Sequence, residues 1–463
     1  MMGQKLTNLQ GEAKYQWSVL ISIFCASLIF KLVVFFAFYR GDVHQLLQPD
    51  SGTYLEPAMA LLKQGNYGHI FIRTPGYPTF IAAFFYLFGH NLSAIIIAQL
   101  ILSIIPIFCG YLITRRLFNG RAGLITAVFL AVDYLFFSYA YFVLTDYLYA
   151  VTLSLVFLFG VWVLTESNPK YRHAFLLGLF FAIATLIRPV NYYLLFPSVA
   201  GLFIYLRFQK LRFKKIFLIT LLMLLPNVLL VGGWQIRNKI AMGTFQYSGI
   251  TTPANVKNYF PQNYALYVEK YGDPQSHYLK ANFKIITDHP SLALKQMGIG
   301  FAKLMLGSNP ILVDFFCRPE NIKFYWKMQG KIQQLFWRGD FRQGIDELLS
   351  HPAAMTVFLY KIGLVFLNLM LYVLFIIGVR ALYIRNLLKP KLFAHLFLAG
   401  SALYFILLCS NNASYARFRL PFQLLIDFYA SVGWVAVWVK IKKLSFYPTK
   451  RIDSSITCVN YDK

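Results

Sequence analysis

Two aspartates are the residues of this sequence best suited to acid–base chemistry. Asp50 precedes a short predicted helix, about 54–64, and Thr53 and Glu56 have the spacing of a capping box. A carboxylate held at a membrane surface can act as a general base, although Asp is also common at helix starts for structural reasons. Asp146 lies at a turn between two apolar stretches, where a carboxylate is costly without a partner. Asp50 and Asp146 are therefore candidate catalytic residues, with capping as the structural alternative.

Arginines are predicted at the same membrane surface as the two aspartates. Arg73 opens a rigid turn that contains two prolines and a glycine. The other four lie near the ends of apolar stretches: Arg188, Arg237, Arg417 and Arg419. A guanidinium can give two hydrogen bonds to one phosphate, and short outer loops normally avoid positive charge. The pattern predicts a bound phosphate, with contact to lipid headgroups as the alternative.

Neighbouring side chains extend this candidate site. Tyr54, Tyr77 and Asn238 are candidates for the lining of a substrate cavity. Asp50 and Asp146 are also the residues that a divalent cation would use, but no ligand spacing supports a metal. The sequence has no GxxxxGK[ST] motif, so nucleotide binding has no support. The cofactor, if any, stays open at this point.

The composition places these residues in a membrane protein. The chain has 463 residues, of which 58% are hydrophobic and only 13% are charged, whereas a soluble domain is about a quarter charged. Apolar stretches approach the roughly 20 residues that a helix needs to cross a bilayer, and open strands there would leave backbone groups unpaired. These stretches fall at 17–39, 92–113, 122–141, 144–164, 173–188, 190–206, 216–233, 353–379, 391–409 and 420–439. We therefore predict an all-α integral membrane protein with about ten transmembrane helices.

Basic residues predict the orientation of these helices. If the N-terminus is cytoplasmic, the loops near 115–121, 170–172, 207–215 and 380–391 and the C-terminal tail are cytoplasmic, and all are basic. This orientation requires that the apolar segment 77–89, too short to span, lies in the interface. The net charge of +26 follows from these loops. Without a basic stripe on a soluble domain, nucleic acid is not an expected partner.

The topology divides the chain into three parts. Residues 1–233 form an N-terminal transmembrane catalytic module with interfacial helices in a first outer loop, 40–91. Residues 234–352 form a soluble outer-face region, expected to be mostly helical, in which 291–306 has helical apolar spacing. Residues 353–463 form the C-terminal transmembrane helices and a basic cytoplasmic tail.

The order of short motifs resembles the bacterial branch of the C-type-fold membrane glycosyltransferases, which is related to protein mannosyltransferases and the lipid A aminoarabinose transferase. The matching motifs are Asp50-Ser-Gly-Thr-Tyr54, Arg73-Thr-Pro-Gly-Tyr-Pro78 followed by FYLFGHN, Thr145-Asp146, LIRPV at 186–190, Gly233-Trp-Gln-Ile-Arg-Asn238 with Gly243, Asp288-His-Pro290 and Arg417-Phe-Arg-Leu-Pro421. One position departs from the aminoarabinose branch, because Ile72 stands where that branch has an acidic residue.

The resemblance implies a mechanism and a location. It places Asp50 at the reacting centre and Asp146 on the next outer hairpin, and it gives the carrier phosphate to Arg73 and Arg417. It implies transfer of a hexosyl or pentosyl unit from a polyprenyl-phosphate donor such as one on undecaprenyl phosphate. Direct attack of the acceptor on this donor should invert the anomeric centre. We expect a glycolipid such as lipopolysaccharide, or a surface polysaccharide, as acceptor in preference to protein. The expected location is the bacterial inner membrane, with both termini cytoplasmic and the active site facing the periplasm or cell exterior.

Two other classes of protein compete with this prediction. A transporter or flippase for an anionic lipid or polyprenyl phosphate would place charges along a path through the membrane. Lys31 and Asp133 lie inside predicted spans and need partners, but such residues are few and no inverted repeat joins the halves. A non-catalytic membrane assembly protein would bury Asp50 away from any cavity. The sequence itself does not specify the sugar, the acceptor or the oligomeric state.

Overall fold

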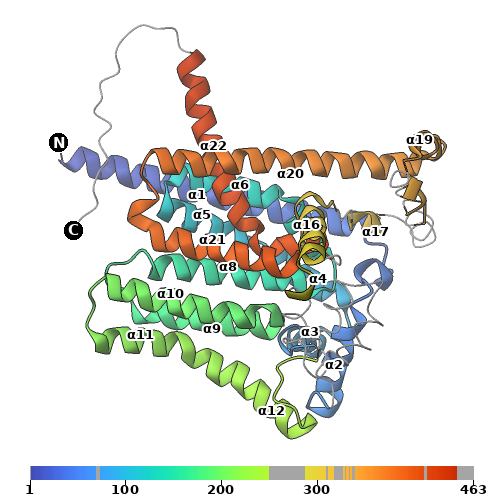
Figure 1. Cartoon of the computed structure of the whole chain (residues 1–463), viewed down its shortest axis with the longest axis horizontal. Coiled ribbons are helices and arrows are strands. Elements are labelled where there is room, and N and C mark those ends of the chain that lie inside the picture. Colours follow the sequence, from blue (N-terminus) through green and yellow to red (C-terminus); the bar gives the residue numbers. More distant parts are fainter. Residues whose placement is uncertain are drawn as a thin grey trace.

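The chain folds into a bundle of long helices with short helices gathered at one end (Figure 1). The structure is a computed structural model that describes residues 2–445 except 69–72, 250–286, 309–310, 317–326, 329, 333, 336–338 and 411–413. Every regular element in these residues is helical, which confirms the predicted all-α class.

The helices of the N-terminal half alternate between long apolar helices and short connecting ones. Their bounds are α1 Met2–Phe38, η1 Val43–Leu46, α2 Gly52–Gln64, α3 Gly76–Phe88, α4 Leu92–Leu102, α5 Ile104–Leu117, α6 Gly120–Val132, α7 Tyr134–Ser138, η2 Tyr139–Tyr141, α8 Thr145–Val163, α9 Tyr171–Ile187, η3 Pro189–Leu194, α10 Leu195–Phe208, α11 Phe213–Pro226, the π-turn η4 Asn227–Val231 and α12 Gly232–Met242.

The C-terminal half contains three long apolar helices and a set of shorter ones. Their bounds are α16 Pro290–Leu306, α17 Leu312–Phe316, α19 Phe341–Leu349, α20 Pro352–Ile384, η5 Lys389–Lys391, α21 Leu392–Cys409, η6 Ala416–Arg419 and α22 Leu420–Ser445. The helix expected at 291–306 is therefore present as α16.

Eight helical stretches of the described chain are long and apolar enough to cross a membrane, and the bent pair α6–α7 brings the number to nine. The one remaining predicted span, 173–188, corresponds to α9. The 17 residues of α9 fall just short of the usual length of a transmembrane helix. The segment predicted to lie in the interface forms α3, a helix of 13 residues. The expected division of the chain at 233 and 352 stays a prediction.

Helix α8 is the centre of the bundle (Figure 1). In α8, 83% of the spanning window is buried inside the protein, against 22% in α1. Tyr147 and Tyr149 of α8 are fully buried, as are Tyr139 and Tyr141 just before it. Because α8 is enclosed by other helices, a polar residue at its first turn is held by protein rather than by lipid.

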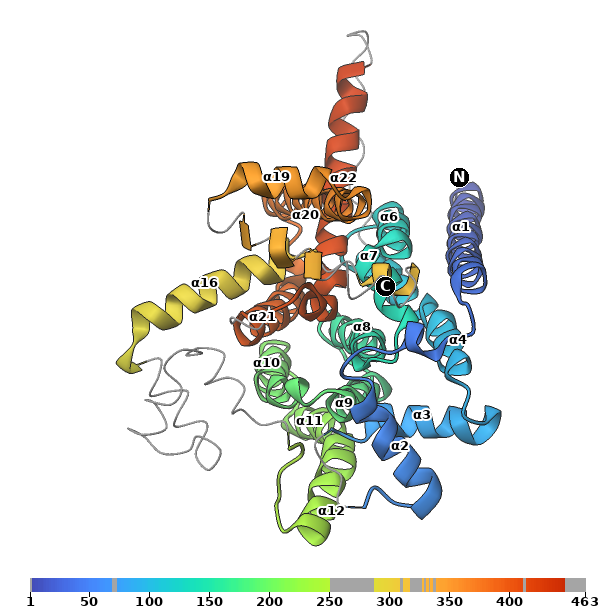
Figure 2. The same ribbon diagram turned by 90° about the vertical axis from the view of Figure 1, so that its right-hand side faces the viewer.

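The two ends of the bundle have different characters. At one end, the Lys391 ammonium donates to the Arg116 carbonyl at 2.5 Å, and the Arg116 guanidinium donates to Thr165 at 3.0 Å. Three loops that were predicted on one side of the membrane therefore meet there. The opposite end carries α2, α3, α12 and α17, and Figure 2 looks onto it. We call this opposite end the outer end, after the predicted topology.

Helices α20 and α22 approach each other closely at two glycines. A Cβ added to Gly378 would overlap the Tyr429 carbonyl oxygen, and one added to Gly433 would overlap the Leu374 carbonyl oxygen. Small residues allow helices in lipid to come into close contact, so this pair sets the spacing of the two C-terminal helices.

We expect Gly378→Ala and Gly433→Ala to destabilise the purified protein in detergent, each by about 1–3 kcal/mol, because the helices must separate to admit a methyl group. The measurement is the thermal unfolding midpoint. Gly363→Ala is the matched control on α20, since a Cβ there meets nothing within 4 Å. If all three variants melt alike, the close approach does not govern the stability of this helix pair.

Candidate functional site

Asp50 lies between two arginines that come from distant parts of the chain. Its Oδ1 is 3.4 Å from Nη2 of Arg73, and its Oδ2 accepts a hydrogen bond from Nη1 of Arg417 at 3.0 Å. The Asp50 side chain is 36% exposed, and both guanidiniums are less exposed than it is. Each carboxylate oxygen thus has its own cationic partner, while the group stays open to solvent.

A second carboxylate–guanidinium pair lies close to the first. Nη1 of Arg188 donates to Oδ1 of Asp146 at 2.6 Å, and the Asp146 side chain is only 2% exposed. The Phe418 ring joins the two pairs, since the guanidinium carbons of Arg188 and Arg417 lie 5.7 Å and 5.1 Å from its centroid. We call Asp50, Arg73, Asp146, Arg188 and Arg417 the outer-face cluster.

Contacts between neighbouring residues bring the two aspartates together. The Ser51 hydroxyl donates to the Val143 carbonyl at 2.8 Å, and the hydroxyls of Tyr54 and Thr145 are 3.3 Å apart. The residues that follow Asp50 therefore touch those that precede Asp146. Both aspartates also act electrostatically on Arg417, which places the two carboxylates around one guanidinium.

Tyr54 is a buried member of the same site. The Arg73 guanidinium carbon lies 4.6 Å from the centroid of its ring, and Nε of Arg73 donates to Thr53 at 2.9 Å. Burial raises the pKa of the Tyr54 phenol, while the charges of Arg73 and Arg188 lower it. The hydroxyl is therefore protonated at neutral pH and available for hydrogen bonding.

The turn before α3 places Arg73 beside Arg188. A Cβ added to Gly76 would come within 2.7 Å of the Leu186 carbonyl group, so only glycine allows this approach to the end of α9. The buried Thr74 hydroxyl donates to the Ile187 carbonyl at 3.1 Å. Arg73 precedes this contact and Arg188 follows α9, so docking of the turn fixes both guanidiniums in one region.

Two of the expected site residues lie elsewhere at the outer end. The Arg237 guanidinium stacks over Trp234, with its carbon 4.9 Å from the ring centroid, and donates to the Gly68 carbonyl. Asn238 is fully buried, accepts from Arg237 at 3.0 Å and donates to the Gln246 carbonyl at 2.8 Å. These contacts fasten α12 to the loop after α2, and none joins either residue to the cluster.

The placement of Arg419 also departs from the prediction. It is completely buried, and each of its guanidinium nitrogens donates to protein acceptors. Its N–H groups are thus already committed, which is incompatible with the expected role in binding phosphate directly.

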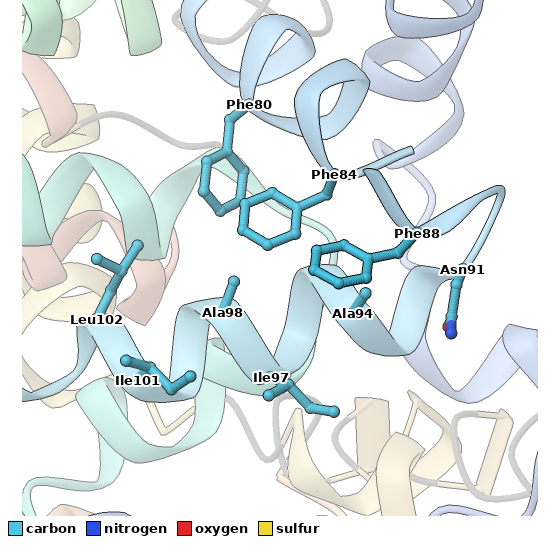
Figure 3. A pocket seen from close by; sticks show the side chains of 9 residues that line it. All are labelled: Phe80, Phe84, Phe88, Asn91, Ala94, Ile97, Ala98, Ile101 and Leu102. Carbon is cyan, nitrogen blue, oxygen red and sulfur yellow. The ribbon is translucent and has the colours of Figure 1, made fainter. Parts of the chain in front are cut away.

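Tyr77 lies behind the cluster and leads to an apolar groove. Its hydroxyl donates to Gln99 at 2.8 Å, and its fully buried ring packs edge-on against Tyr54 and stacks on Phe80. Phe80 begins a groove of about 550 Å³ between α3 and α4. Figure 3 shows the lining residues: Phe80, Phe84, Phe88, Asn91, Ala94, Ile97, Ala98, Ile101 and Leu102. The contacting rings of Tyr54, Tyr77 and Phe80 therefore connect the cluster to the groove.

The described part of the chain offers no group of three or more His, Cys, Asp or Glu side chains arranged to hold a metal ion. In the cluster, three guanidiniums surround the two carboxylates, an environment that repels a divalent cation and attracts an anion.

Sequence reasoning missed three residues around the site. Phe418, between Arg417 and Arg419, supplies the ring that Arg188 and Arg417 both contact. Gln423 and Asp427 are buried at the start of α22, where Gln423 donates to both Asp133 and Asp427. Polar residues at i and i+4 in a predicted span are the signal that could have identified the last two.

Part of the chain is similar to a known protein family. Residues 73–234, about a third of the chain, match the family described as dolichyl-phosphate-mannose-protein mannosyltransferase. The matched stretch begins at Arg73 and includes Asp146 and Arg188. No curated protein matches the chain. The family match confirms the resemblance to C-type-fold membrane glycosyltransferases related to protein mannosyltransferases.

Solved structures of two kinds are similar to the chain. One is the archaeal oligosaccharyltransferase AglB from Archaeoglobus fulgidus, in complex with an inhibitory peptide and a dolichol-phosphate, with 13% identity and a TM-score of 0.47 over 96% of this chain and 53% of that one. Another is ArnT from Cupriavidus metallidurans bound to undecaprenyl phosphate, with 15% identity and a TM-score of 0.39 over 95% of this chain and 81% of that one. The chain thus spans about half the length of the AglB chain.

Proposed function

We propose that the protein transfers a sugar from a polyprenyl-phosphate donor to a hydroxyl acceptor at the outer face of the membrane. The observation that carries the proposal is the outer-face cluster, in which a solvent-accessible carboxylate is held between two guanidiniums beside an apolar groove. The match to a mannosyltransferase family and the donor named in its description support the same chemistry.

The cluster suits the charge changes of such a transfer. The acceptor oxygen forms a bond to the anomeric carbon, the bond from that carbon to the phosphate oxygen breaks, and the acceptor proton passes to a base. The donor phosphodiester carries one negative charge, and the departing phosphate gains a second. Three guanidiniums against two carboxylates leave a net positive charge, which stabilises the departing phosphate more than the donor.

The two carboxylates have different roles in this proposal. Asp50 is 36% exposed and can reach an acceptor hydroxyl as a general base. Asp146 is 2% exposed and holds Arg188, so it acts through that arginine. A phosphate that binds Arg73 and Arg417 must compete with Asp50 for them. Phosphate binding therefore releases Asp50, which can then take the acceptor proton. Attack from the side opposite the phosphate inverts the anomeric centre.

The proposal also includes the chemical class of the donor and of the acceptor. We propose undecaprenyl phosphate or a similar polyprenol as the carrier and a hexose or pentose as the sugar. A glycolipid such as lipopolysaccharide or a surface polysaccharide is our proposed acceptor in preference to protein. The proposed location is a bacterial inner membrane, with the cluster on the periplasmic or exterior side and both termini in the cytoplasm.

We expect Asp50→Asn to lower the rate of sugar transfer by about 10²–10⁴-fold, because the amide cannot accept the proton. The same variant should bind free polyprenyl phosphate several-fold more tightly, since Asn does not compete as an anion for Arg73 and Arg417. The measurements are turnover with a polyprenyl-phosphate sugar and equilibrium binding of the carrier alone.

Asp42→Asn is the matched control in the same loop. Asp42 accepts from the His44 amide at 2.9 Å, a capping contact that Asn preserves, so both measurements should remain unchanged. Near-normal turnover of Asp50→Asn would remove Asp50 from the mechanism, and weaker carrier binding would rule out competition for the arginines.

We expect Arg73→Lys and Arg417→Lys to raise the KM for the donor by about tenfold or more, because Lys keeps the charge but loses the planar fork. Alanine should raise it further, and the KM for the acceptor should change little. Arg237→Lys is the control, since this arginine lies at the outer end but outside the cluster. Equal effects of all three lysine variants would point to general attraction of lipid headgroups.

The apolar groove is our proposed position for the isoprenoid chain of the donor. It begins at Phe80, which contacts the cluster through Tyr77 and Tyr54. Phe80, Phe84 and Phe88 line one side along α3, and Ala94 and Ala98 leave space on α4 (Figure 3). A helix rises about 1.5 Å per residue, so the groove follows α3 for about 12 Å.

We expect Ala98→Phe to fill the groove and raise the KM for long-chain donors by about tenfold, while a donor with a two-isoprene chain is used as before. The reason is that the short chain does not reach far along α3. Ala83→Phe, at an exposed position of α3 outside the groove, should leave both substrates unaffected. An equal loss with long and short donors would rule out chain binding at this groove.

A further inference from the structure

Arg419 forms an extensive set of polar contacts with the side chains and carbonyl groups around it. Its Nε donates to Gln423 at 3.0 Å. Its Nη2 donates to the Tyr134 hydroxyl at 2.5 Å and to Asn368 at 3.0 Å. Its Nη1 donates to the Tyr372 hydroxyl at 3.0 Å and to the carbonyls of Leu304, at 3.1 Å, and Met305. The acceptors come from α7, α16, α20 and α22.

These contacts fix the end of α16 against the turn η6. The last turn of a helix exposes carbonyl groups, and a cation is favourable there, so Arg419 stabilises the carboxyl end of α16. The Tyr372 hydroxyl donates to the Met305 carbonyl at 2.7 Å and so ties α20 to the same point. A Cβ added to Gly307, just after α16, would lie 3.5 Å from the Ala416 amide nitrogen, which shows how closely this end meets η6.

Two buried carboxyl groups are linked to Arg419 through Gln423. This side chain accepts from Arg419 at 3.0 Å and donates to Asp133 at 2.9 Å and to Asp427 at 3.4 Å. Asp133 also caps α7 by accepting from the Leu135 and Phe136 amides at 2.9 Å. A buried guanidinium with these partners is held in one position, because each lost contact would leave a polar group unsatisfied.

Arg417 lies two residues before Arg419 on the same short 3-10 turn, Ala416–Arg419. Only Phe418 separates the two arginines along this turn. Arg419 is bonded to four helices of the bundle, whereas Arg417 pairs with Asp50 at 3.0 Å. The position of Arg417 against Asp50 therefore depends on the contacts that Arg419 makes.

We propose that Arg419 is a positioning residue, whose contacts with α16, α20 and α7 set the place at which Arg417 meets Asp50 and the donor phosphate. This inference rests on the proposed function, because it assigns Arg419 an effect on the transfer reaction. It also assigns Tyr372 and Asn368 to the same role, since they hold Arg419 without reaching the cluster.

Tyr372→Phe tests the proposal with a small change. It removes one acceptor from Arg419 and one donor to Met305 but keeps the ring, so the protein should fold with little change in melting temperature. We expect the rate constant for transfer to fall about tenfold, because an error of about 1 Å at a reacting group can cost a hundredfold. Tyr383→Phe is the matched control on α20, where the side chain is 74% exposed, and should have no effect.

A double-mutant cycle separates positioning from general stability. In an Arg417→Ala background, Tyr372→Phe and Asn368→Leu should cause no further loss, because the residue that they position is already absent. Additive losses would overturn the proposal, as would normal turnover of Tyr372→Phe with a normal melting temperature. Failure of the proposed function is distinct, because the wild-type protein would then transfer no sugar from polyprenyl-phosphate donors.

Discussion

The pairing of charge is the constraint on which the rest of this site depends. A guanidinium or a carboxylate that is partly or fully enclosed by protein is costly alone, so each needs a partner of opposite sign. The outer-face cluster meets this requirement with three guanidiniums and two carboxylates. The numbers are unequal, and the surplus is positive. An anion that develops charge during a reaction is the chemical species best stabilised in such a place.

The backbone makes this arrangement possible by bringing together segments that are far apart in sequence. Asp50 and Arg417 are separated by 367 positions, and Asp146 and Arg188 by 42. The close contact of Gly76 with the end of α9 brings Arg73 into the region of Arg188. The central position of α8 completes the arrangement, because its enclosed first turn holds Asp146 away from lipid. The same enclosure explains why Asp146 is buried while Asp50, on a surface loop, is not.

Hydropathy and charge were sufficient to predict the helical class, most of the candidate spans and the short helix α3, because each rests on a local property of the sequence. The site required more. Arg417 and Arg419 have almost the same sequence context, yet Arg417 faces Asp50 and Arg419 is buried among four helices. The 3-10 turn η6 determines which of the two arginines faces Asp50 and which is buried. The orientation of this turn depends on contacts with distant parts of the chain. For the same reason, the sequence did not indicate that Arg237 lies outside the outer-face cluster. Its stacking on Trp234 follows from the path of α12.

The different exposure of the two carboxylates is the basis on which we propose Asp50 rather than Asp146 as the base. Either aspartate could serve as a base, and both have a guanidinium within hydrogen-bonding distance. A base must reach the acceptor, and the Asp146 side chain is almost completely enclosed. Its bond to Arg188, at 2.6 Å, also shows a carboxylate whose charge is already engaged. Asp50 differs because its two partners are the same arginines to which we assign the donor phosphate. In the proposed mechanism its release is therefore coupled to donor binding, so the base becomes free when a sugar is present to be transferred.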